Sequence, residues 1–397
     1  MKTIMILGAS LFQVLAIEQA LKMGLRVVAV DMNPDSVGFR IPGVISECIS
    51  TIDIPAVVAA AKQYRIDGIL TLASDMPMRT IATISKALGL PGITHDAALK
   101  ATNKVFMRQA LKEHHVPIPL FFKASTKEEY DEVIRQFQVP FIVKPADNAG
   151  SRGIFQITDI SNRKSIQEAY EYSKRYSRNG DVVVEEYMRG PEVSVETLTV
   201  NGECHVIQVT DKITTGAPHF VEMGHTQPTR LSDVVVREIV RVAKMANKAI
   251  GITIGPSHTE IIVTDEGPKI VELGARLGGD CITSHLVPLS TGINMVECCI
   301  KIALGENPDI NPKFQRGSAI RYFEQIEGEV KEISGLEEVG ILPFVKQIGI
   351  MHGVGEKVTE IDSSLARMGF VIVQGENAND AERKAQLAMN EIKVIIK

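Results

Sequence analysis

The sequence predicts an α/β protein that contains more than one domain. Its 397 residues exceed the roughly 150 residues of a typical domain. With 45% hydrophobic and 23% charged residues, its composition is that of a folded globular protein. In the first 90 residues, apolar runs of strand length alternate with amphipathic runs of helix length. Strands that alternate with helices in this way are typical of a parallel, doubly wound sheet.

The N-terminal segment has the pattern of a βαβ unit. We expect a strand at 3–7, a turn at Gly8-Ala9-Ser10, a helix that ends at Gly24 and a second strand at 26–31. A strand at 69–72 and a helix at 76–88 repeat the alternation. Because the turn lacks the full GxGxxG spacing, we expect a Rossmann-like scaffold that binds no dinucleotide of its own.

Helices and strands follow in a mixed order after residue 94. Helices are expected at 95–101 and 104–114, before an extended connector that contains Pro117 and Pro119. Strands and a helix at 161–177 fill the segment up to 189, and strands dominate from Glu192 onward. Further helices are expected at 230–250, 293–304 and 380–393.

Composition excludes several classes of function. The 43 Lys and Arg against 48 Asp and Glu give a net charge of −5, so no basic surplus indicates a nucleic-acid or membrane partner. The chain has no Trp and only 5% aromatic residues, which argues against a stacking surface for single-stranded nucleic acid. Five scattered cysteines without a CxxC spacing favour a reducing, cytoplasmic setting. No apolar run predicts a transmembrane segment.

A lysine followed by a glycine-rich turn is the sharpest local signal. The apolar run 141–143 ends at Lys144, and a turn with Gly150, Arg152 and Gly153 leads to a second strand at 154–157. Such a turn can present backbone N–H groups to phosphate oxygens, while Lys144 and Arg152 add positive charge. The spacing differs from that of a Walker A motif. A plain β-hairpin with a solvated lysine is the alternative interpretation.

Two glutamates mark a second candidate site. The runs 257–263 and 269–273 flank turn residues and predict an antiparallel hairpin, in which a register symmetric about Glu266 places Glu260 opposite Glu272. Two ionised carboxylates in that position repel unless a cation lies between them, and magnesium is the natural one. If the strand continues, Arg276 shares its face with Glu272. Two exposed glutamates on an edge hairpin are the alternative.

The segment 181–192 is a third, weaker signal. An apolar strand leads into acidic residues and then into a break at Gly190-Pro191. Its main chain could pair with the edge of an adenine ring, although any strand that leaves a core has a similar pattern.

In this order and spacing, the three features resemble the ATP-grasp ligases over nearly the whole chain. The resemblance implies a Rossmann-like pre-ATP-grasp domain at 1–94, an ATP-grasp domain at 95–310 with a lid subdomain at about 120–188, and a small α+β C-terminal domain at 311–397. It implies phosphate binding by Lys104 and Lys144, and a mobile lid at Gly150-Ser151-Arg152-Gly153. It further implies an adenine hinge at Glu185, Glu186, Tyr187 and Met188, ribose binding by Glu192, magnesium ligands at Glu260 and Glu272, and a catalytic Arg276.

One position departs from the family pattern. Many members have Asn two residues after the second glutamate, where this chain has Gly274, so water or Asp280 is expected to complete the metal site. The run 274–279 and the upstream segment 219–225 look more like the amino-acid ligase branch than the biotin carboxylase branch. Five residues are candidates for substrate contact: Glu222, His225, His258, Gly278 and Gly279. A histidine that only satisfies a loop is as common as one that binds substrate.

The resemblance implies an ATP-dependent ligase that uses magnesium, with manganese as the other candidate metal. It would join a small-molecule carboxylate, expected to be an amino acid, to an amine, and release ADP and phosphate. Three alternatives stay open: a purine-pathway ligase similar to phosphoribosylglycinamide or carboxyaminoimidazole ribonucleotide synthetase, bicarbonate activation of the carbamoyl phosphate synthetase type, and a non-catalytic nucleotide-binding regulator. A homodimer is the default expectation for its assembly.

Overall fold

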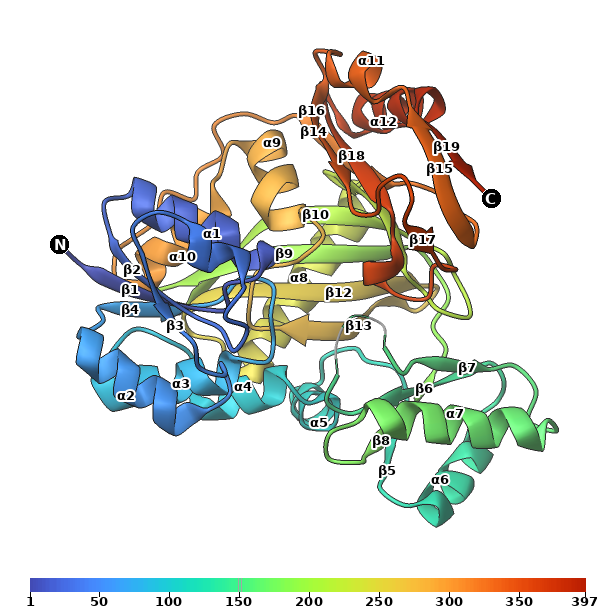
Figure 1. Cartoon of the computed structure of the whole chain (residues 1–397). Helices are drawn as coiled ribbons and strands as arrows, with labels where there is room; N and C mark the ends of the chain where they lie inside the picture. The colour runs from blue at the N-terminus through green and yellow to red at the C-terminus, as the bar shows by residue number, and fades with distance from the viewer. Residues whose placement is uncertain (149, 151) are drawn as a thin grey trace.

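The computed structural model describes residues 1–148, 150 and 152–397 (Figure 1). Its N-terminal unit is a parallel sheet with strand order β3-β2-β1-β4, which confirms the expected α/β class. The strands are β1 Thr3–Leu7, β2 Arg26–Val30, β3 Val44–Glu47 and β4 Gly68–Leu70, and the helices are α1 Leu11–Lys22, α2 Ile54–Tyr64 and α3 Met78–Leu88. The strand β3 and the helix α2 were not predicted. Since the four residues of β3 are mostly half-buried, they give no clear hydrophobic signal.

The two faces of the N-terminal sheet belong to different cores. Successive side chains of a strand point to opposite faces. Ile4 and Ile6 of β1 therefore pack in one core with α1 and with the distant α10, Met295–Ala303. Met5 and Leu7 pack in a second core with α2 and α3. The helix α10 thus ties the N-terminal sheet to a segment almost 300 residues away.

An antiparallel sheet of four strands forms a separate lobe, drawn in green in Figure 1. Its order is β5-β8-β6-β7, and α6 and α7 pack on it around buried aromatic side chains such as Tyr130 and Phe141. The strands are β5 Phe121–Ala124, β6 Phe141–Pro145, β7 Phe155–Ile157 and β8 Val182–Glu186, and the helices are α6 Lys127–Val133 and α7 Arg163–Tyr176. The lobe corresponds to the segment expected to form a lid.

The largest sheet has eight strands in the order β13-β12-β9-β10-β11-β14-β18-β16. It crosses the expected domain boundary at residue 310, because β11 pairs with β14. Its strands are β9 Glu192–Val200, β10 Glu203–Thr214, β11 Glu222–Gln227, β12 Gly255–Thr264, β13 Gly267–Gly274, β14 Gly317–Tyr322, β16 Val345–Ile350 and β18 Gly369–Gly375. A small sheet joins β15 Gly328–Ser334 to β17 Lys357–Val358 and β19 Lys393–Ile396. The remaining helices are α4 His95–Ala101, α5 Lys104–Glu113, α8 Asp233–Ile250, α9 Val287–Thr291, α11 Leu336–Gly340 and α12 Ala378–Glu391.

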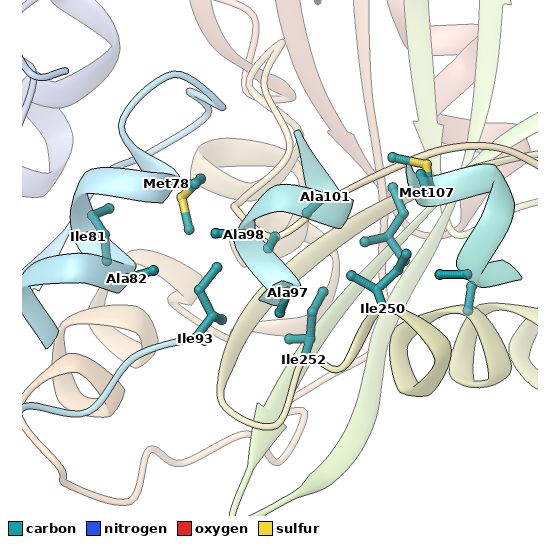
Figure 2. Close-up of a cluster of buried hydrophobic side chains, with 14 of the residues drawn as sticks. Met78, Ile81, Ala82, Ile93, Ala97, Ala98, Ala101, Met107, Ile250 and Ile252 are labelled. Carbon is teal, nitrogen blue, oxygen red and sulfur yellow. The ribbon is translucent and has the colours of Figure 1, made fainter. Parts of the chain in front are cut away.

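A continuous apolar core joins the N-terminal unit to the large sheet. The helix α4 lies between α3 and the end of α8, as Figure 2 shows. Ala97 and Ala98 of α4 are fully buried, and their small side chains allow this close packing. On one side they face Met78 and Ile81, and on the other they face Ile250 and Ile252 (Figure 2). The N-terminal unit is therefore held firmly against the sheet that carries the candidate site.

Among the described residues, no single helix is long and apolar enough to cross a membrane. The segments Ile282–Thr291 and Met295–Ala303 satisfy the length and composition criteria only as a pair, with a bend of 113° between them. Leu286, Val287 and Ile300 of this pair are fully buried inside the fold.

The core between α3, α4 and α8 predicts a large stability effect. Replacing Ile250, which is fully buried, by Ala should lower the free energy of unfolding by about 2–5 kcal/mol, because a cavity remains where the side chain packed. Urea unfolding followed by circular dichroism measures the change. The matched control is Ile341→Ala, at a position that is 83% exposed, where we expect a change within about 0.5 kcal/mol. Equal effects of the two substitutions would contradict this account of the core.

Candidate active site

A cavity of about 830 Å³ lies where the N-terminal unit, the lobe and the large sheet meet. It contains most of the residues that the sequence singled out: Lys104, Lys144, Gly150, Arg152, Glu185, Glu186, Tyr187, Met188, Glu192, Glu222, His225, His258, Glu260, Glu272, Arg276 and Gly279. Gly153 and Gly278 are not part of its lining, and Ser151 lies outside the described residues. Segments far apart in the sequence thus converge on one site.

Two lysines lie at the end of the cavity next to the lobe. Lys104 is in the first turn of α5, whose N-terminus is capped by the side chain of Asn103. Its Nζ lies 3.1 Å from Glu272 and donates a hydrogen bond to the Asn148 carbonyl at 2.5 Å. Lys144, on β6, contacts Glu185 at 2.6 Å. Both ammonium groups are almost fully buried, which strengthens their interaction with any anion that enters the cavity.

The side chain of Glu185 belongs to a buried ion-pair network. The Arg108 guanidinium donates to both of its carboxylate oxygens, at 2.7 and 3.0 Å, while Lys144 approaches from β6. Burial raises the pKa of Glu185, but Arg108 and Lys144 outweigh it and lower the value to about 2. Glu185 is one of the four residues expected to form the adenine hinge. Its carboxylate, however, is the counter-ion of Lys144. Sequence patterns did not indicate Arg108.

The predicted pairing of Glu260 with Glu272 is confirmed, but the register has a different origin. The hairpin turns at Asp265-Glu266, with Thr264 opposite Gly267, so the ladder is not symmetric about Glu266. A bulge at Val271 then shifts the register by one residue and brings Glu272 opposite Glu260. The carbonyl of Val271 accepts a hydrogen bond from Arg108 at 2.7 Å, so the bulge and the buried network stabilise each other.

Lys212 of β10 is surrounded by carboxylates and was not identified from the sequence. Its Nζ lies 2.7 Å from Glu192, 3.1 Å from Glu260 and 3.3 Å from Glu222. Burial lowers the pKa of Lys212, but the three carboxylates raise it well above its usual value. Burial raises the pKa of Glu260, whereas Lys212 and His258 hold it well below its usual range. For Glu192, burial has the larger effect and raises the pKa.

His258 bridges two glutamates at the side of this cluster. Its Nδ1 lies 2.6 Å from the buried carboxylate of Glu196, and its Nε2 lies 3.4 Å from Glu260. Burial lowers the pKa of His258, but Glu196 and Glu260 raise it to about 9. Gly278 packs directly against this pair, since a Cβ there would lie 2.7 Å from His258 Nδ1 and 2.8 Å from Glu196. The structure therefore places Gly278 behind the site.

Arg276 is held by Asp75 of the N-terminal unit. Its guanidinium donates to the two carboxylate oxygens at 3.0 and 3.2 Å, a bidentate arrangement that fixes the plane of the group. A Cβ at Gly274 would lie 3.0 Å from Asp75 Oδ1 and 3.1 Å from Arg276. The ion pair thus fills the space that a larger side chain at Gly274 would need.

Asp280 is engaged by an arginine of the C-terminal region. Arg367 donates to both carboxylate oxygens at 2.8 Å, and His225 lies 3.5 Å away. Burial raises the pKa of Asp280, but Arg367 and His225 lower it by more, so the pKa lies below its usual value. No group of three or more His, Cys, Asp or Glu side chains that could hold a metal occurs within the part of the chain that the structure describes. The opposed Glu260 and Glu272 nevertheless fit magnesium, which usually takes one or two carboxylates together with substrate phosphates.

Comparison with known families agrees with this geometry. The ATP-grasp domain family matches residues 137–284, which include β6, the lobe helix α7 and the hairpin with Glu260 and Glu272. Residues 137–284 thus match an ATP-grasp domain. The family of L-amino acid ligase C-terminal domain 2 matches residues 321–397. The expected ATP-grasp fold and its ligase character are confirmed.

Individual relatives match most of the chain. An L-arginine-specific L-amino acid ligase of Bacillus subtilis is 27% identical over 304 residues, which are 74% of this chain and 72% of that protein. A phosphoribosylamine–glycine ligase of Caldanaerobacter subterraneus is 25% identical over 96% of this chain and 93% of its own length. The crystal structure of an L-amino acid ligase from Bacillus licheniformis has the same fold, with a TM-score of 0.85 and 24% identity over 100% of this chain and 99% of that one.

The buried network around Glu185 makes stability depend on pH. Because the pKa of Glu185 is depressed in the folded state, its contribution is complete above the unfolded value near 4.3 and is lost as the pH falls toward 2. Replacing Glu185 by Gln should cost about 3–5 kcal/mol at pH 7, since Lys144 and Arg108 would lose their counter-ion. Urea titrations of wild type and Glu185→Gln between pH 7 and pH 3 measure the free energy of unfolding of each. We expect the difference between the two free energies to become smaller below about pH 4. The exposed control Glu203→Gln should stay close to wild type, and a pH-independent difference would contradict the assignment.

The packing at Gly274 predicts that the family's usual Asn is not tolerated here. Gly274→Asn should displace the Asp75–Arg276 pair and lower the free energy of unfolding by about 1–3 kcal/mol through overpacking. The same substitution at Gly202, in a turn where a Cβ would have no neighbour within 4 Å and where Asn adopts a positive φ readily, serves as the control. Thermal and urea unfolding of both variants measure the change. If Gly274→Asn were as stable as wild type, the Asp75–Arg276 ion pair would have moved aside at little cost, which would contradict this prediction.

Proposed function

We propose that the protein joins a small-molecule carboxylate, an amino acid, to an amine in a reaction that uses ATP and magnesium and passes through an acyl phosphate. The observation that carries the proposal is that one cavity contains the buried Lys104 and Lys144, the opposed Glu260 and Glu272, and the fixed Arg276. Phosphoryl transfer needs positive groups and a metal around the transferred phosphate. The cavity contains the positive groups and two opposed carboxylates that would hold the metal.

The proposed roles of the nucleotide-binding residues follow from their places in the cavity. Lys104, Lys144 and the loop with Gly150 and Arg152 would bind the phosphates. Glu192 would bind the ribose hydroxyls. The main chain at Glu186, the last residue of β8, and at Tyr187 and Met188, which follow it, would contact the adenine.

The metal has a clear place in this scheme. Glu260 and Glu272 would hold magnesium, or manganese in its place, and the ion would offset the negative charge of the phosphates. Lys104 contacts Glu272, and Lys212 contacts Glu260, whose pKa is held well below its usual range by Lys212 and His258. A cation that entered the cavity would therefore meet an ionised carboxylate at Glu260.

The reaction has two bond exchanges. An oxygen of the substrate carboxylate attacks the γ-phosphorus of ATP, the bond to the β–γ bridging oxygen breaks, and ADP leaves. The amine nitrogen then attacks the acyl carbon, the bond to the phosphate oxygen breaks, and phosphate leaves with the electron pair while the nitrogen loses a proton. Arg276, held by Asp75, would stabilise the negative charge that develops at the acyl phosphate. The glycine-containing loop would close over the site and keep out water that hydrolyses acyl phosphates.

The experiment that tests the proposal compares two classes of substrate. An amino acid is favoured because the match to L-amino acid ligases covers residues 321–397, whose fold reaches the cavity through Ser363, Ser364 and Leu365. The relative that joins phosphoribosylamine to glycine covers 96% of the chain and supports the second class. Phosphate release with ATP and magnesium over a matrix of amino acids and amines, with phosphoribosylamine and aminoimidazole ribonucleotide included, separates the two classes. ATP binding without phosphate release on any pair would contradict the proposal.

The proposed machinery predicts two inactive variants. Lys144→Ala and Glu272→Gln should each abolish substrate-dependent ADP formation, since one removes a phosphate-binding cation and the other a proposed metal ligand. A coupled assay for ADP measures the loss, and circular dichroism checks that both variants are folded. Lys164→Ala and Glu203→Gln, at exposed positions outside the cavity, are the matched controls. Near-normal turnover of either cavity variant would overturn its assigned role.

A further inference from the structure

The turn at Gly8-Ala9-Ser10 lies where Rossmann folds bind a phosphate, but here the protein's own side chains fill it. The main-chain N–H of Ala9 donates to the carboxylate of Asp31 at 2.8 Å. Gly8 has a φ of +104°, and a Cβ at this position would lie 2.8 Å from Cγ of Gln13. The glycine therefore makes room for the side chain of Gln13, which comes from the first turn of α1.

Gln13 continues the hydrogen bonding of the sheet beyond the end of β4. The pairing of β1 with β4 ends at Ile6 and Leu70. Two residues later, the carboxamide of Gln13 donates to the Leu72 carbonyl at 2.6 Å and accepts from the Leu72 N–H at 2.8 Å. Because both residues are almost fully buried, these two bonds are costly to lose. One side chain thus fixes the direction in which the chain leaves β4.

The chain turns toward the cavity directly after Leu72. Ala73 has a φ of +48°, which is unfavourable for a residue with a side chain, so this turn needs support from its surroundings. The carbonyl of Asp75 then accepts from the N–H of Met78 at 3.2 Å, where α3 begins. Asp75 is therefore held between the bonds at Leu72 and the start of α3, and its carboxylate binds Arg276.

The position of Arg276 depends on two parts of the protein. The residue follows β13 of the large sheet, but the carboxylate that it contacts belongs to the N-terminal unit. Its guanidinium also donates to the Leu277 carbonyl, at a longer distance of 3.3 Å. A shift of about 1 Å at a reaction centre can reduce the rate about a hundred-fold, so the place of Asp75 matters for any reaction that uses Arg276.

We propose that Gln13 is a positioning residue for Arg276 and acts on it through the turn at Ala73 and through Asp75. This inference rests on the proposed function, because it assumes that Arg276 stabilises negative charge at the acyl phosphate. Gln13 is not among the residues that line the cavity. The N-terminal unit, which we expect to bind no dinucleotide, thus contributes to the reaction by placing a group of the neighbouring sheet.

The test measures substrate-dependent ADP formation in Gln13→Met, Asp75→Asn and the double variant. Met has nearly the length of Gln but forms neither bond to Leu72. Since Arg276 acts on charge that develops during the reaction, we expect kcat to fall at least about ten-fold in Asp75→Asn and about five-fold in Gln13→Met, with the KM for ATP within about two-fold of wild type. In the Asp75→Asn background, Gln13→Met should lower kcat by less than about two-fold, because its effect passes through Asp75.

Thr71→Val is the matched control. Thr71 is also buried just beyond the end of β4, and its hydroxyl donates to the Leu7 carbonyl at 2.7 Å. This bond holds β4 to β1 and does not reach Leu72. We therefore expect Thr71→Val to lower the midpoint of thermal unfolding, as Gln13→Met does, while its kcat stays within about two-fold of wild type.

The outcomes separate this inference from the proposed function. If wild type forms no ADP with any carboxylate and amine, the proposed function fails and the inference falls with it. If wild type is active, a normal kcat in Asp75→Asn or in Gln13→Met shows that the inference alone is wrong. An equal loss of kcat in Thr71→Val, or independent effects of Gln13→Met and Asp75→Asn, would also overturn it, because Gln13 would then support only the fold. Should Gln13→Met not fold, the same comparison with Gln13→Glu, which can still accept from the Leu72 N–H, decides.

Discussion

The rest of the site depends on the repulsion between two glutamates that face each other across a hairpin. Glu260 and Glu272 carry like charges on neighbouring strands, an arrangement that repels unless cations surround it. Lys104, Lys212 and His258 come from three different segments, and each contacts one of the two carboxylates. Much of the cavity's layout follows from this requirement, since every element that supplies a cation must reach the same hairpin.

The supporting cations need partners of their own, and these partners extend the network. Lys212 also contacts Glu192 and Glu222, and His258 contacts the buried Glu196. Arg108 links the bulge of the hairpin to Glu185, and Glu185 in turn holds Lys144. Residues proposed to bind phosphate, ribose, metal and substrate are therefore electrostatically connected. A change in one of them alters the electrostatic surroundings of the others.

Local patterns predicted a large part of this arrangement, and long-range contacts account for the rest. The βαβ unit, the glycine turn after Lys144 and the hairpin that carries Glu260 and Glu272 could be predicted, because each depends on neighbouring residues. Lys212, Arg108, Asp75 and Arg367 could not, since each has an ordinary local context and acquires its partners only through the tertiary fold. The bulge at Val271 was missed for the same reason: Arg108, on α5, stabilises it. The family pattern drew attention to Gly274, and the structure adds a steric explanation in the Asp75–Arg276 pair.

The pairing of β11 with β14 has a consequence for how the chain can be divided. Because Gly224 to Gln227 are bonded to residues 318–321, the C-terminal region completes the sheet that carries Glu222 and His225. A fragment that ended before β14 would leave β11 as an open sheet edge with unpaired backbone groups, which is a template for aggregation. The C-terminal region is thus an integral part of the large sheet. A chimera that exchanges this region between ligases must therefore preserve the hydrogen bonds between β11 and β14 in order to fold.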